Sequence, residues 1–199
     1  FDLTGLNAGS YTSVTLDLGG CIGSQPGPIN LIDPTPPTAT ASTTTSAICE
    51  GSDIILSGNT VPGATYDWTG PNMYTSTFED NTIVGATTAA TGVYTLIITL
   101  NNCVSAPSNV NITVDALPVI SGTLAACVGT TSQLTATTSP GITPWISSNP
   151  AVASIDATGL ITAITAGSVA ITYTNAAGCQ DSETFVVSTT PTVNDPADQ

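Results

Sequence analysis

The chain has 199 residues, with no lysine, arginine or histidine and 14 aspartates and glutamates, which gives a formal net charge of −14. Without histidine or lysine it lacks an imidazole base, a Schiff-base amine and a phosphate-binding loop, and without arginine it lacks a clamp for phosphate or carboxylate. A nucleic-acid backbone would be repelled by this charge. The composition therefore predicts a protein that is not an enzyme and binds no nucleic acid.

Apolar residues make up 41% of the chain and charged residues only 7%, while Thr is the commonest residue. Thr and Val favour strands, and the 18 Gly and 14 Pro punctuate turns. There is no sustained helical apolar stripe, and no apolar run approaches the ~18 residues that span a bilayer. We predict an all-β protein without membrane insertion. The N-terminus does not resemble a signal peptide, so an export signal would have been removed or would lie upstream.

Turn residues and repetition divide the chain into parts. We predict the last two strands of a truncated domain in 1–34, a complete domain in 35–116, a second in 117–190 and a linker into a following domain in 191–199. A proline-rich joint separates the first two parts. The predicted strands lie near 10–18 and 28–32, then near 38–45, 53–57, 64–68, 75–78, 82–84, 93–100 and 108–114, and then near 119–124, 132–137, 144–147, 153–155, 160–162, 168–173 and 184–187.

Four of the five cysteines repeat with their surroundings. Cys49 and Cys127 each open the pattern C-x-G-[ST]-x-x-x-L-[ST]. Cys103 and Cys179 each follow a strand and a short turn, and the distance along the sequence from Cys49 to Cys103 is almost the same as that from Cys127 to Cys179. The repeat predicts the disulfides Cys49–Cys103 and Cys127–Cys179, each at one end of its domain. Two structural disulfides indicate an oxidising, extracellular compartment. Zinc is disfavoured, because the chain has no C-x-x-C pair and no His.

Cys21 resembles the later cysteine of each pair. We predict that it is unpaired within this segment, with its partner in the missing first half of the truncated domain. A free thiol or an intermolecular bridge stays open as the alternative.

Each predicted domain combines seven short strands, two cysteines and a mid-domain tryptophan, Trp68 or Trp145. This combination favours an immunoglobulin-like sandwich, and the chain as a whole an extended array of tandem sandwiches. Aromatic side chains can stack on sugars, but the shared repeat position of the two tryptophans favours core packing.

Single acids lie at the predicted junctions, at Asp33, Asp115 and Asp195. Ca²⁺ takes several hard oxygen ligands, and such acids can bind it and stiffen a joint. No D-x-D-x-D-G loop is present, so solvated acids are the favoured interpretation. We expect no cofactor, with Ca²⁺ as the weak alternative.

The sequence SSNPAVASIDATGLITA at 147–163, followed by AGSVAIT at 166–172, resembles the bacterial Ig-like group 2 domain of surface adhesins. The first complete domain is similar to Ig/PKD-like repeats of very large Bacteroidetes surface proteins, including gliding-motility adhesins. The residues that carry this similarity are ICEGS at 48–52, GATYDWTGPN at 63–72 and TGVYT at 91–95, together with Cys103. In such families these modules are usually spacers, and adhesive tips lie elsewhere.

We therefore expect a structural stalk segment of a large secreted adhesin or extracellular filament at a bacterial cell surface. Its partners would be neighbouring domains of the same chain, surface glycans or other copies in a filament. Two alternatives stay open: a module whose loops bind glycan or protein, and a filament subunit completed by a neighbour's strand. The stalk hypothesis also predicts that the disulfides limit extension under load.

Overall fold

The computed structural model describes residues 9–18, 20–31 and 35–190. Over these residues the regular structure is β-strand, apart from one 3₁₀ turn, η1 (Thr88–Ala90). The all-β prediction is confirmed. Within the described part of the chain there is no helix long and apolar enough to cross a membrane.

The first two strands form an antiparallel hairpin. β1 (Gly9–Leu18) pairs with β2 (Cys21–Leu31), and Leu18 lies opposite Cys21 across the turn. Gly20 in that turn has a φ of 95°, which favours glycine. The second strand begins at Cys21, well before the predicted 28–32. Asp33 lies outside the described residues.

The first sandwich has two sheets, ordered β3-β5-β8 and β4-β11-β9-β6-β7, with β10 paired to β9. Its strands are β3 (Ala41–Thr43), β4 (Ala47–Cys49), β5 (Ile54–Gly58), β6 (Thr65–Gly70), β7 (Tyr74–Ser76), β8 (Asp80–Ile83), β9 (Gly92–Leu100), β10 (Cys103–Val104) and β11 (Ser108–Asp115).

Alternation along β9 builds the core of this sandwich. Tyr94, Leu96 and Ile98 point inward and are fully buried, and they meet Trp68 from β6. The hydroxyl of Tyr94 donates a hydrogen bond to the carbonyl of Ala90, at 2.9 Å. A tyrosine at the start of this strand, bonded to backbone a few residues upstream, is typical of immunoglobulin-like folds.

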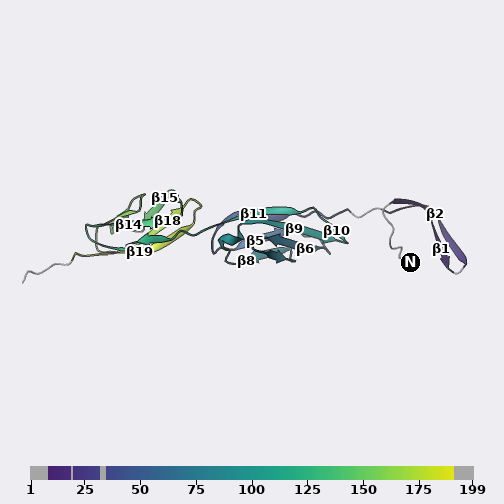
Figure 1. The fold of residues 1–199 in the computed structure, drawn as a ribbon, viewed down its shortest axis with the longest axis horizontal. Helices are drawn as coiled ribbons and strands as arrows, with labels where there is room; N and C mark the ends of the chain where they lie inside the picture. The colour runs from purple at the N-terminus through teal and green to yellow at the C-terminus, as the bar shows by residue number, and fades with distance from the viewer. Residues whose placement is uncertain (1–8, 19, 32–34, 191–199) are drawn as a thin grey trace, which may run out of the picture.

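The second sandwich also has two sheets, ordered β12-β14-β17-β16 and β13-β19-β18-β15. Its own core gathers around residues such as Leu134, Ile171 and Phe185. Figure 1 shows the two sandwiches following one another along the long axis. The strands are β12 (Ile120–Gly122), β13 (Ala125–Cys127), β14 (Thr131–Ala136), β15 (Pro140–Ser147), β16 (Ala153–Ile155), β17 (Leu160–Ala163), β18 (Gly167–Asn175) and β19 (Gln180–Ser188).

Strand directions place Cys49 and Cys103 at opposite ends of the first sandwich. Cys49 lies opposite Asp115, at the end of β11 that pairs with the start of β9. Cys103 lies opposite Leu100, at the far end of β9. β9 has nine residues, so its ends are roughly 25–30 Å apart at ~3.3 Å per residue. A disulfide needs Cα atoms within about 7 Å, so the predicted Cys49–Cys103 bridge is wrong.

The same geometry separates Cys127 from Cys179. Cys127 lies opposite Ser188, beside the start of β18, whereas Cys179 follows the end of that strand. The predicted Cys127–Cys179 bridge is therefore also wrong. Each sandwich carries one cysteine at each end rather than two at the same end.

The turn between β16 and β17 contains Asp156, whose carboxylate is held by several hydrogen bonds. One carboxylate oxygen of Asp156 accepts hydrogen bonds from the Thr158 hydroxyl (2.6 Å), the Thr158 amide (2.8 Å) and the Leu160 amide (3.1 Å). These bonds, the Thr158 hydroxyl foremost, lower the pKa of Asp156 below its ordinary 3.8. Because they favour the charged form, their stabilisation is complete above the unfolded-state pKa and is lost as the pH falls through the folded-state pKa.

The Asp156→Asn variant should therefore be less stable than the parent at pH 7, and this difference should shrink as the pH falls below about 4. Denaturant unfolding of the two proteins at a series of pH values measures the gap. A gap of the same size at pH 7 and at the acid end would show that the charge of Asp156 contributes nothing.

Candidate functional site at the joint between the two sandwiches

A disulfide joins Cys49 to Cys179, two residues 130 positions apart in the sequence, with Cα atoms 5.6 Å apart. The first lies at the end of β4 in the first sandwich, and the second lies in the turn between β18 and β19 of the second. The bond therefore crosses the joint instead of closing a loop within one domain. This is the pairing that replaces the two bridges predicted from the sequence repeat.

Backbone hydrogen bonds fix Cys49 at the joint. The amide of Glu50 donates to the carbonyl of Asp115 (2.8 Å), and the amide of Gly51 donates to the carbonyl of Ala86 (2.8 Å). The carbonyl of Cys49 itself accepts from the amide of Ser52 (3.1 Å). These bonds turn the chain sharply after β4, with Gly51 at a φ of 86°, and hold the cysteine at the edge of the sandwich.

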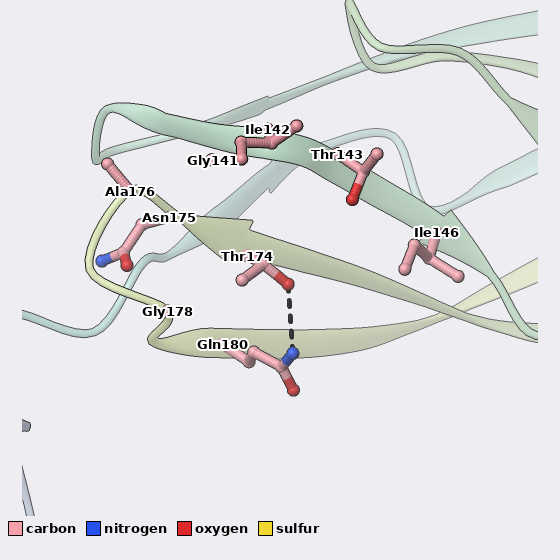
Figure 2. A pocket seen from close by; sticks show the side chains of 9 residues that line it. All are labelled: Gly141, Ile142, Thr143, Ile146, Thr174, Asn175, Ala176, Gly178 and Gln180. Atoms are coloured by element: carbon pink, nitrogen blue, oxygen red, sulfur yellow. Dashed lines mark hydrogen bonds between the residues drawn. The ribbon is translucent and has the colours of Figure 1, made fainter.

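Asn175 organises the turn that presents Cys179. Its side-chain oxygen accepts hydrogen bonds from the amides of Ala177 (3.0 Å) and Cys179 (2.9 Å). Its side-chain nitrogen donates to the carbonyl of Ala116 in the joint (3.2 Å). Figure 2 shows Asn175 at this turn. One buried amide thus fixes the turn and ties it to the connecting peptide.

The connecting peptide is short and bonded to the second sandwich. Only residues 116–119 lie between β11 and β12. The amide of Val119 donates to the Thr137 hydroxyl (3.0 Å), and the amide of Ile120 donates to the carboxylate of Asp181 (2.9 Å). The Cys179 sulfur also lies 4.0 Å from the carbonyl oxygen of Asp115. Two covalent links and several hydrogen bonds therefore cross or brace this joint.

The Asn175→Ala variant should lose about 2–3 kcal/mol of stability in the second sandwich, because two turn amides lose their acceptor. The matched control is Gln180→Ala. Gln180 is exposed and its amide makes one hydrogen bond, to the Thr174 hydroxyl at 3.1 Å (Figure 2). That change should cost at most about 0.5 kcal/mol. Chemical denaturation compares the two, and equal losses would contradict the role given to Asn175.

The two tryptophans differ in burial. Trp68 is completely buried, and its indole N–H donates to the carbonyl of Glu79 at 3.2 Å. Trp145 is half-buried and packs edge-to-face on Tyr173, with ring centroids 4.7 Å apart. Trp68 is too buried to stack on a sugar. The partly buried side chain of Trp145 packs against the core of its own sandwich.

Of the acids predicted as Ca²⁺ candidates, only Asp115 lies among the described residues. Asp115 lies at the joint, where its carbonyl accepts the amide of Glu50. Among the described residues there is no group of three or more His, Cys, Asp or Glu side chains placed to hold a metal ion. Asp33 and Asp195 lie outside those residues, so the expectation of solvated acids, with Ca²⁺ as the weak alternative, stays a prediction there.

Two shallow hollows flank the turn that carries Cys179. One, of about 380 Å³, lies at the joint and is lined by polar and small side chains that include Asp115, Thr138 and Asn175. The other, of about 370 Å³, lies on the β15–β18–β19 face (Figure 2). Ile142 and Ile146 line this second hollow and are both exposed. No cysteine lines either hollow, and Asp115 is the one acid among the residues that line them.

Cys103 and Cys127 lie at the outer ends of the two sandwiches. Cys103 is at the end of the first sandwich away from the joint, and Cys127 is at the end of the second sandwich away from the joint. Cys127 forms no disulfide within the described residues. The side chain of Cys21 lies outside the described residues, so the expectation that it is unpaired stays a prediction.

Comparisons with known proteins agree with this architecture. Residues 114–187 match the family model of the bacterial Ig-like domain (group 2). No curated protein matches the chain. Among solved structures, a C-terminal 282-residue fragment of intimin, in complex with the intimin-binding domain of the translocated intimin receptor, has a TM-score of 0.53 at 15% identity. That match covers 75% of this chain and 64% of the intimin fragment.

Two further structures show a weaker likeness. Murine CEACAM1b has a TM-score of 0.38 at 15% identity, over 76% of this chain and all of that one. Three N-terminal domains of the outer capsid protein Hoc of bacteriophage RB49 have a TM-score of 0.40 at 15% identity, over 75% of this chain and 58% of that one. The sheet order, the intimin match and the family match together show an immunoglobulin-like β-sandwich fold, and residues 114–187 match its group 2 bacterial form.

Proposed function

We propose that this chain is a stalk segment of a large secreted bacterial adhesin or surface filament, in which Ig-like modules are held in line as spacers. The observation that carries the proposal is the Cys49–Cys179 bond across the joint. A disulfide and a four-residue connection restrict how far one sandwich can bend against the other. Figure 1 shows the arrangement that results, with one sandwich continuing the line of the other.

The chemistry of the chain fits a role outside the cell. Structural disulfides persist in oxidising compartments. The group 2 match and the sequence resemblance support a surface protein of the gliding-motility adhesin type. The polar surface relies on hydroxyl and amide groups, and the chain has no Lys or Arg for trypsin-like proteases to cleave.

Small-angle X-ray scattering of the whole chain tests this function. The oxidised chain should scatter as a stiff elongated particle, and Cys49→Ser should broaden the distribution of interatomic distances, because the joint then bends about its peptide alone. The matched control is Cys127→Ser, which removes a cysteine from the same repeat position but leaves the joint intact. A compact or fully flexible oxidised chain would contradict a spacer role.

A second candidate function is supported by the exposed Ile142 and Ile146 beside the hollow of Figure 2. Exposed apolar side chains around a concave surface favour contact with a ligand. Under this alternative the second sandwich binds glycan or protein through its β15 face. A glycan array probed with the parent chain and with Ile142→Ser tests this alternative. Binding to a glycan by the parent that is lost in the variant would support a binding module, and a stalk segment predicts no such binding.

A further inference from the structure

Cys127 is held in a copy of the environment that presents Cys49 to its disulfide partner. The amide of Val128 donates to the carbonyl of Ser188 (2.9 Å), and the amide of Gly129 donates to the carbonyl of Ala163 (2.9 Å). The carbonyl of Cys127 accepts from the amide of Thr130 (3.0 Å). Each bond has a counterpart of the same kind around Cys49, and Gly129 has a φ of 84° where Gly51 has 86°.

The strand pairing around the two cysteines is also the same. β4 runs parallel to β11 with Cys49 opposite Asp115, and β13 runs parallel to β19 with Cys127 opposite Ser188. Both side chains are half-buried. Ser188 therefore marks the position from which a next joint would begin, as Asp115 does for the observed one.

The sequence after Ser188 repeats a feature of the observed joint. Proline is the third residue after Asp115, as Pro118, and the third residue after Ser188, as Pro191. Proline stiffens a connection by fixing φ and removing an amide donor. The sequence of a short, stiff joint thus recurs beside the second cysteine.

We propose that Cys127 forms a disulfide with the turn cysteine, equivalent to Cys179, of another Ig-like module that follows Ser188 in the polypeptide. This inference rests on the proposed stalk function. Successive modules would then be joined at every such joint by two covalent links, the peptide and a disulfide. The repeated cysteines would serve the array as a whole and leave each module without an internal bridge.

The bond forms by oxidation of two thiols. Cys127 and its partner lose two protons and two electrons as the S–S bond forms. A small-molecule or protein disulfide of the oxidising compartment accepts the electrons by thiol–disulfide exchange and is reduced to two thiols. Cys179 is unavailable to Cys127, because it lies at the other end of the sandwich and is already bonded to Cys49.

An extended chain tests the inference. Residues 1–188 of this chain are followed directly by a second copy of residues 116–199, which repeats the observed joint after Ser188. The protein is produced under oxidising conditions, alkylated, digested with a protease specific for acidic residues and mapped without reduction. The expected result is that the Cys127 peptide and the Cys49 peptide are each joined to a Cys179 peptide, which has the same sequence in both copies. Loss of the Cys127 bond in the control variant then assigns that bond to Cys179 of the appended copy.

The matched control changes Cys179 to Ser in the appended copy alone, and alkylation should then label Cys127 fully. An alkylated Cys127 in the folded extended chain would overturn the inference, as would a bond between Cys127 residues of two chains. Far-UV circular dichroism checks that the copy has folded. Small-angle scattering from the same sample distinguishes the two proposals. A rigid elongated particle in which Cys127 is alkylated would contradict the proposed Cys127 disulfide but not the proposed stalk function.

Discussion

Held at its two ends and stretched, the oxidised chain is expected to lengthen far less than the reduced chain. Tension that enters from the N-terminal side reaches Cys49, crosses the disulfide to Cys179 and leaves through β19. Through this bond the load can bypass the chain between the two cysteines. Of the two sandwiches, only β3, β4 and β19 lie on the loaded path, and strands are already extended.

Reduction adds the bridged segment to the loaded path. Cys49 and Cys179 are 130 positions apart, so complete unfolding after reduction releases about 430–470 Å of chain at ~3.3–3.6 Å per residue. The sequence repeat also predicted extension limiters, but one within each domain. The observed pairing shields both sandwiches with a single bond.

Single-molecule stretching measures this difference. Cys49→Ser should give the long increments even in the absence of reductant, and Cys127→Ser should behave like the parent chain. Long increments in the oxidised parent would show that the bond does not bypass the sandwiches, and they would remove the mechanical argument for the stalk.

The second large effect is expected from Trp68→Ala. Trp68 is completely buried and loses both its packing and its hydrogen bond to Glu79 in this variant. Truncation of a buried aromatic residue costs about 3–5 kcal/mol. Because the two sandwiches have separate cores, the loss should fall on the first and leave the second nearly unchanged.

Hydrogen exchange read by mass spectrometry resolves the two sandwiches. In Trp68→Ala the amides of β9 should exchange much faster, while those of β18 keep their protection. The matched variant, Trp145→Ala, should cost less, because Trp145 is only half-buried. Equal acceleration in both sandwiches would contradict the independence of the two cores.

The fold class follows from the sequence because alternation is a local signal. In β18 the inward residues Val169, Ile171 and Tyr173 are buried while their neighbours are not. A period of two, broken by Gly and Pro, is enough to indicate strands and a sandwich. The strands β4 and β13 were missed because each has three residues and exists through its parallel pairing with a distant strand.

The disulfide could not be predicted from the cysteine repeat alone. The repeat shows that Cys49 and Cys127 are equivalent, and that Cys103 and Cys179 are equivalent. It does not show whether each pair closes within a domain or across two domains. The answer depends on strand direction, which places the start of β9 at one end of the sandwich and the turn after it at the other.

Non-reducing peptide mapping of the oxidised chain shows whether the disulfide crosses the joint between the two sandwiches. Cleavage at acidic residues puts every cysteine on its own peptide, because Asp33, Asp80, Asp115 and Asp156 separate them in turn. The structure predicts that the Cys49 peptide is joined to the Cys179 peptide. Recovery of Cys49 with Cys103 and of Cys127 with Cys179 would contradict the linked joint and everything built on it.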